Sequence, residues 1–168
     1  MNFYTSDQHF FHANIIKYCK RPFSSVEQMN QTLINNWNKK VTNKDNVYIL
    51  GDLSWGSIDQ TLEILKQLKG RKYFIKGNHD GFILNGIRGQ FEWVRDYAMI
   101  KDDGQKVVLF HYPIYAWDCQ FHGSIHLYGH IHNNYEQYPE LLTWKNAYNV
   151  GVEVNDYEPK TLKEILSL

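Results

Sequence analysis

The chain contains five short apolar runs, and each is followed at its C-terminal end by Asp, Asn or His. They are residues 3–5 before Asp7 and His9, 47–50 before Asp52, 73–75 before Asn78 and His79, 107–110 before His111, and 125–128 before His130 and His132. Short β-rich runs bounded by turn residues are typical of strands. In α/β proteins, ligands bind in loops beyond the carboxyl ends of the strands. The pattern therefore predicts an α/β fold whose polar strand-end residues meet at one sheet edge.

Helical signals lie between these runs. Ser57 and Gln60 form a capping box before a helical stripe of apolar residues, and Gly70 stands where a left-handed residue ends such a helix. A similar box at residues 24–28 precedes a second stripe, and Pro159 is expected to open a last helix. Residues 90–100 are compatible with a strand pair or an irregular loop.

Length and charge narrow the class of protein. The chain has 168 residues, of which 43% are hydrophobic, and 18 Lys and Arg balance 18 Asp and Glu. These values exclude a disordered chain and favour one domain over residues 1–168. A net charge of zero disfavours binding to nucleic acid by bulk electrostatics, although a nuclease is not excluded. A small phosphorylated substrate, nucleotide-like or otherwise, is fully compatible.

The cysteines and the N-terminus indicate the cellular setting. Cys19 and Cys119 are too few for a disulfide framework and form no CxxC pair, so we expect both to be reduced and structural. The first residues contain neither a basic segment nor a long apolar one, and no apolar run reaches the roughly 18 residues of a membrane helix. The sequence therefore predicts a soluble cytoplasmic protein. It does not indicate an oligomeric state.

The histidines carry the strongest functional signal. Five of the eight stand in the strand-end segments, namely His9, His79, His111, His130 and His132. A single histidine is more often a hydrogen-bonded surface or core residue, and a single Gly-Asp pair is usually a turn. Five histidines at successive strand ends are difficult to explain in that way.

These residue types suit a metal centre. In an extended segment, residues i and i+2 point to the same side, so Asp7 with His9, and His130 with His132, are predicted to present ligands in pairs. Asp52 offers two carboxylate oxygens with which to bridge two cations. Imidazole and carboxylate donors without thiolate suit Mn, Fe, Zn, Co or Ni better than Ca or Mg.

A pair of such ions has a known chemical use. Two metals about 3.5–4 Å apart activate water against a phosphoryl centre and stabilise the attacking and leaving oxygens. Asn78 adds a neutral amide ligand without further negative charge. The residues therefore indicate phosphoester hydrolysis with two divalent transition-metal ions, Mn first among the candidates.

The ordered motifs resemble those of the calcineurin-like metallophosphoesterase superfamily. They are Asp7-x-His9, Gly51-Asp52, Gly77-Asn78-His79-Asp80, His111 and Gly129-His130-x-His132. The resemblance implies two mixed β-sheets sandwiched between helices, with a dinuclear centre at the sheet edge. Residues 6–16 and 21–23 further resemble a small bacterial and phage branch of the superfamily.

The resemblance also implies a role for each motif residue. One metal would be held by Asp7, His9 and His132, and the other by Asn78, His111 and His130. Asp52 would bridge them together with the hydroxide that attacks the phosphorus. His79 would face the substrate as general acid or transition-state stabiliser, with Asp80 orienting it or serving as a turn residue.

The subgroup and the substrate are less constrained. Asp52 is followed by Leu53, whereas protein Ser/Thr phosphatases resembling this motif carry Asp-Arg-Gly. A small phosphodiester is the favoured substrate, and a phosphomonoesterase, a nuclease and a non-catalytic metal-bound scaffold are the alternatives. His12 and Arg21 are the predicted substrate contacts. Arg88, Tyr112, Trp55 and Trp117 are weaker candidates for contacting phosphate or stacking on a base.

Overall fold

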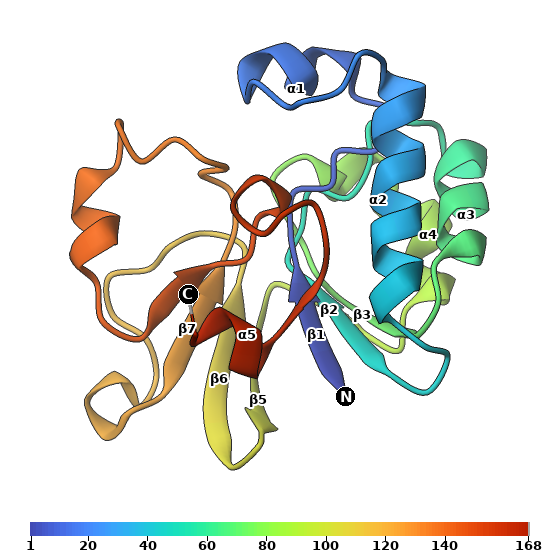
Figure 1. The fold of residues 1–168 in the computed structure, drawn as a ribbon. Coiled ribbons are helices and arrows are strands. Elements are labelled where there is room, and N and C mark those ends of the chain that lie inside the picture. Colours follow the sequence, from blue (N-terminus) through green and yellow to red (C-terminus); the bar gives the residue numbers. More distant parts are fainter. Residues whose placement is uncertain (168) are drawn as a thin grey trace.

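The computed structural model describes residues 1–167 and contains two mixed β-sheets that pack face to face (Figure 1). The first sheet has the order β4-β3-β2-β1-β9, in which β1 to β4 are parallel and β9 is antiparallel. Its strands are β1 (Asn2–Thr5), β2 (Asn46–Ile49), β3 (Arg71–Ile75), β4 (Val94–Arg95) and β9 (Lys160–Thr161).

The second sheet has the order β5-β6-β7-β8, with β5 antiparallel to β6 and the others parallel. Its strands are β5 (Tyr97–Asp102), β6 (Gln105–Phe110), β7 (Ile125–Tyr128) and β8 (Ala147–Asn149). The segment at 90–100, left open by its sequence, contributes one strand to each sheet. The predicted fold class of two mixed sheets flanked by helices is confirmed.

Most of the helices cover the outer face of the first sheet, as Figure 1 shows, whereas Leu162 and Ile165 of the last helix pack in the cluster between the two sheets. The α-helices are α1 (Ala13–Tyr18), α2 (Val26–Lys40), α3 (Ile58–Gln67), α4 (Leu84–Ile87) and α5 (Leu162–Ile165). The predicted capping box of Ser57 and Gln60 is present at the start of α3, and the Ser25 hydroxyl caps α2 by accepting from the Gln28 amide. Pro159 does not open α5, because β9 intervenes and Thr161 caps that helix with Glu164.

Strand alternation divides the apolar residues among three layers. Phe3, Val47 and Phe74 pack with α2 and α3, whereas their neighbours Tyr4 and Tyr48 pack with the second sheet. The outer face of the second sheet is covered by irregular chain and short 3₁₀ helices, namely Gln120–His122 and Pro139–Thr143. The remaining 3₁₀ helices are Asp80–Phe82, Arg88–Gln90 and Val152–Val154.

Two further features of the structure concern its cysteines and the length and apolar character of its helices. Cys19 and Cys119 are both free thiols, the first buried and the second partly exposed. Within the described residues, no helix combines the length and the apolar character needed to cross a membrane.

Candidate metal centre and active site

The predicted ligands meet where the carboxyl ends of strands from both sheets face one another. Asp7 and His9 follow β1, Asp52 follows β2, and Asn78 follows β3. From the second sheet, His111 follows β6, and the pair His130 and His132 follows β7. The backbone N–H of His130 donates to both carboxylate oxygens of Asp7, at 3.2 and 3.0 Å, which links the two sheets at the site.

The backbone at these residues is left-handed rather than extended. Asp7, His9, Asp52, His130 and His132 have φ values of 59°, 52°, 54°, 71° and 52°. Positive φ is uncommon for residues other than Gly, and its cost is tolerated where the surrounding structure holds it. The side chains do converge, but the argument from extended geometry was wrong, because tight turns rather than strand alternation direct them.

Two glycines allow the loops to approach this closely. A Cβ atom on Gly129 would collide with Ser6 and Asp7, and one on Gly77 would collide with Asp52. These positions explain why the Gly-Asn-His and Gly-His-x-His motifs begin with glycine.

The first donor set comprises Asp7, His9 and His132, which place one ligand atom each within 4.8 Å of one another. Asp7 and His9 are 0% and 2% exposed. The His9 Nε2 atom is buried and has no hydrogen-bond partner among the described residues. An unpartnered buried nitrogen is costly without a ligand, so this atom fits a metal ion.

The second donor set comprises Asn78, His111 and His130. The Asn78 Oδ1 atom lies 3.0 Å from His111 Nε2 and 3.0 Å from His130 Nδ1. His111 is fully buried, and its Nδ1 lies 2.6 Å from the Leu50 carbonyl oxygen. A hydrogen bond from Nδ1–H to this carbonyl fixes the tautomer and leaves Nε2 as a donor to a metal.

Asp52 lies between the two sets. Its Oδ2 atom is 3.6 Å from His9 Nε2 and 3.7 Å from His111 Nε2. Its Oδ1 atom accepts a hydrogen bond of 3.0 Å from the His79 backbone N–H. Of the two Asp52 oxygens, Oδ2 is therefore the one that lies between the two donor sets, while Oδ1 fixes the carboxylate. Together the imidazole, carboxylate and amide donors fit divalent transition metals.

Arg21 contacts no open surface, which corrects its prediction as a substrate-binding residue. Its side chain is 0% exposed, and its guanidinium pairs with Glu153 Oε1 at 2.5 Å while donating to the backbone oxygens of Asp7 and Gln8. Glu153 Oε1 also lies 2.9 Å from His132 Nδ1. A carboxylate on the second nitrogen of a ligating histidine orients the ring. Arg21 therefore acts on His132 through Glu153.

Glu153 is a site residue that was not predicted from the sequence. It follows β8 closely in the chain, so the rule that site residues follow strand ends applies to it as well. Residues 133–148 showed no clear period, which hid β8 and the residues after it.

Asp80 also has a different role from the catalytic one predicted. It is fully buried, and its carboxylate accepts from the backbone amides of Asp52, Leu53 and Gly77 at 2.8, 3.0 and 2.7 Å. It therefore ties the loop after β2 to the loop after β3. This contact positions Asp52 and Asn78 and does not reach the substrate side.

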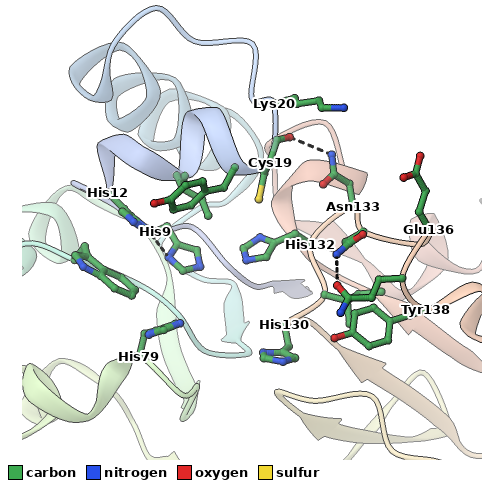
Figure 2. A pocket seen from close by; sticks show the side chains of 16 residues that line it. His9, His12, Cys19, Lys20, His79, His130, His132, Asn133, Glu136 and Tyr138 are labelled. Atoms are coloured by element: carbon green, nitrogen blue, oxygen red, sulfur yellow. Dashed lines mark hydrogen bonds between the residues drawn. The ribbon is translucent and has the colours of Figure 1, made fainter.

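A cavity of about 850 Å³ opens beside the donor atoms. Figure 2 shows His9, His130 and His132 at its centre, His79 and His12 on one side, and Asn133, Glu136 and Tyr138 on the other. His12 stacks on Trp55 with ring centroids 4.3 Å apart, so both lie in the cavity wall. Trp117 is buried and bonded to Ser124, which makes it a core residue rather than a stacking surface.

A model of the calcineurin-like phosphoesterase family matches residues 4–95, which is more than half of the chain. The chain belongs to the calcineurin-like phosphoesterase family. The matched segment carries the first three motifs, and the remaining histidines come from the second sheet.

Relatives of this phosphoesterase are similar over most of their length. It is 44% identical to "Uncharacterized protein MJ1445" of Methanocaldococcus jannaschii, covering 97% of this chain and 88% of the relative. It is 30% identical to "Gene 66 protein" of Mycobacterium phage L5, covering 77% and 76%. The solved structure of AQ665 from Aquifex aeolicus, titled a protein of unknown function, has a TM-score of 0.80 at 28% identity, covering 99% and 98% of the two chains.

Burial, hydrogen bonds and neighbouring charges shift the pKa values of the side chains in the phosphoesterase's site. Burial lowers the pKa of His9 and His130, so these rings are neutral and ready to bind a cation. Burial raises the pKa of Asp7 to about 6. For His132, burial lowers the pKa, but hydrogen bonds with Cys19 and Glu153 and the Asp7 charge outweigh it and raise the pKa to about 11.

Proposed function

We propose that this phosphoesterase is a dinuclear-metal phosphodiesterase that hydrolyses a small phosphodiester. The observation that carries the proposal is the position of Asp52 Oδ2, 3.6 and 3.7 Å from the Nε2 atoms of His9 and His111, which belong to the two donor sets. One carboxylate oxygen shared by two sets fits two adjacent ions. Mn²⁺ is the preferred candidate because the donors mix imidazole, carboxylate and amide without thiolate.

When bound, two such ions would supply an activated water and a Lewis acid for the phosphoryl oxygens. The chain holds the donors in place before any substrate arrives. Asp80 fixes the loops that carry Asp52 and Asn78, and Glu153 fixes His132. The reacting phosphate would therefore meet a preorganised site.

His79 is the proposed proton donor to the leaving oxygen. Its side chain lines the cavity without belonging to either donor set, and its ring centroid lies 6.0 Å from that of His9. Trp55 packs against it at 4.4 Å, which restricts the ring on one side. General acid catalysis of this kind contributes about 10²–10⁴-fold. A metal-bound scaffold has no need for such a histidine.

The charge of the cavity favours a diester over a monoester. A phosphomonoester carries a charge of about −1.5 to −2 at neutral pH and favours an additional cation. Among the described residues that line the cavity, Lys20 is the one with a permanent positive charge, and Glu136 offsets it. Arg21, which was expected to serve, is enclosed by its pair with Glu153.

The test is a comparison of aryl phosphodiester and aryl phosphomonoester hydrolysis with added Mn²⁺. We expect faster turnover of the diester, and a loss of about 10²-fold or more in His79→Ala with both ions retained. His122→Ala is the matched control, because His122 is exposed and outside the site. Faster monoester turnover would overturn the specificity. Near-normal turnover in His79→Ala would overturn its role, and no turnover of either ester by protein holding two ions would favour the scaffold.

A further inference from the structure

A second, smaller hollow is lined in part by Lys76 and Gly81, which flank the Asn78-His79 loop. It has a volume of about 290 Å³ and is formed by the end of β3, the segment 81–88 and strand β4. Its lining residues are Lys76, Gly81, Leu84, Asn85, Arg88, Val94, Arg95 and Asp96. No part of the proposed phosphodiester reaction uses it.

The hollow concentrates positive charge in a chain whose net charge is zero. Lys76, Arg88 and Arg95 line it, against the single carboxylate of Asp96. Within residues 1–167, none of these three cations makes an ion pair or a side-chain hydrogen bond; the Arg95 guanidinium only packs 4.9 Å from the Trp93 ring centroid. Lys40 and Lys160, by contrast, each pair with two carboxylates.

The chain itself fixes how far the hollow lies from the reacting centre. Lys76 and Gly81 immediately flank the segment Gly77–Asp80, which carries Asn78 and His79. Two residues span at most about 7 Å even when fully extended. The backbone at Lys76 and Gly81, on the edge of the hollow next to this loop, therefore lies within about 7 Å of that of Asn78 and His79.

We propose that this hollow is a second phosphate-binding site, which holds a neighbouring phosphate group of the substrate while the scissile ester lies at the metal centre. The proposal rests on the proposed function and narrows the substrate to phosphoesters with at least two phosphate groups. Arg binds phosphate oxygens through two parallel N–H groups, and Lys adds a compact charge. The volume equals that of about ten waters, which is room for a phosphate and part of a sugar.

The first test locates phosphate without using catalysis. Inorganic phosphate is titrated into the full chain loaded with Zn²⁺, and backbone amide NMR shifts are followed. We expect saturable shifts at Asn85, Arg95 and Asp96, with the apparent Kd rising about tenfold or more in Arg88→Gln, because a charged hydrogen-bond donor is lost. Lys44→Gln removes an exposed lysine at the opposite end of β2 and should leave the Kd unchanged. Absent shifts, or equal effects of both variants, would overturn the proposal even if the aryl diester is hydrolysed.

The second test distinguishes the source of the phosphate. We expect kcat/KM for a thymidine dinucleotide to rise about tenfold when a 5′-phosphate is added, and this ratio to fall toward one in Arg88→Gln. If the natural substrate is a small molecule with two phosphate groups, the dinucleotide should show the full gain in kcat/KM. If it is a nucleic-acid strand, the gain should appear only in a single strand of eight nucleotides. No gain in either substrate would contradict the second site. If the protein hydrolyses no ester at all, this result contradicts the proposed function and not the second phosphate-binding site. The NMR titration still tests that site, because it needs no turnover.

Discussion

The two donor sets of the centre differ in how deeply they are enclosed. Asp7 and His9, in the first set, are almost completely buried, and the side chain of His132 is 17% exposed. In the second set, Asn78 is exposed and His130 is half-buried, so only His111 is enclosed. The first set is therefore the more deeply buried of the two, although His9 and His132 line the cavity together with His130 of the second set.

The two sets also differ in what holds their ligands. His132 is oriented by Glu153, which is itself held by the fully enclosed guanidinium of Arg21. Asn78 and His130 bond to each other and to no such buried side-chain pair in the described chain. Groups that hydrogen-bond to a ligating side chain typically change metal affinity by about 10–100-fold. The difference leads us to expect a tightly held first ion and a second ion that exchanges more readily.

A substitution at Asp52, the proposed bridging ligand, should weaken metal binding by both donor sets at once. Asp52→Asn keeps the Oδ1 acceptor for the His79 amide but removes the charge shared by the sets. We expect metal analysis to give at most one ion per chain, and diester turnover to fall about 10³-fold or more, because the loss involves several kcal/mol of metal-assisted stabilisation. Asp103→Asn, on an exposed turn, is the control. Two ions retained in Asp52→Asn would show that Oδ2 is not a bridge.

Glu153→Gln should weaken metal binding by the first donor set alone. The amide cannot replace the charge that orients His132, so we expect the affinity for the first ion to fall about 10–100-fold and excess metal to restore turnover. The variant also leaves Arg21 without its buried partner, which should lower the free energy of unfolding by about 3 kcal/mol in a urea titration. Glu136→Gln, at the exposed rim, should change neither quantity. Unchanged first-ion affinity would reduce the Arg21–Glu153 pair to a purely structural contact.

Asn78→Ala should weaken metal binding by the second donor set alone. It removes the amide oxygen that lies 3.0 Å from both His111 and His130 and touches none of the first-set ligands. We expect competition with a chromophoric chelator to detect one tight ion and loss of the weaker one. Asn85→Ala, outside the cavity of the metal centre, is the control. Equal loss of both ions in Asn78→Ala would mean that the two sets are not separable.

The sequence predicted the parts of the molecule that depend on local pattern. The strands near residues 47 and 107, the Ser57 cap and the ligands at the strand ends follow from residues close in the chain. Parallel strands of one sheet share a carboxyl edge, so the convergence of Asp7, Asp52 and Asn78 could be predicted without coordinates, whereas the ligands after β6 and β7 come from the second sheet.

The rest depends on contacts between distant segments. Arg21 was expected at the substrate because it lies near the first motif, but its partner Glu153 is 132 residues away. Asp80 was expected to act beside His79, yet it bonds to backbone amides of the loop after β2. No local pattern encodes such pairs. The left-handed turns at Asp7 and His130 were likewise hidden, because non-glycine residues rarely adopt them.

The smallest predicted effect is the number of protons that each donor set releases when it binds a metal ion. In the metal-free protein the pKa of His132 is raised to about 11, so its ring is protonated at pH 7.5, and the pKa of Asp7 is raised to about 6. Ligands must lose their protons to bind a cation, so filling the first set should release about one proton at pH 7.5 and nearly two at pH 5.5. Metal affinity should therefore fall as the pH is lowered, most steeply below pH 6.

Calorimetry in two buffers of different ionisation heat measures this release. Asn78→Ala should keep the release, because it retains the first set, whereas Glu153→Gln should reduce it at pH 7.5 by removing one cause of the raised pKa of His132. In the second set, His130 and Asn78 should contribute little, since burial already lowers the pKa of His130 and Asn78 does not titrate. If the proton release disappears in Asn78→Ala, the released proton comes from the second donor set. The second set, and not the first, would then hold the tighter ion.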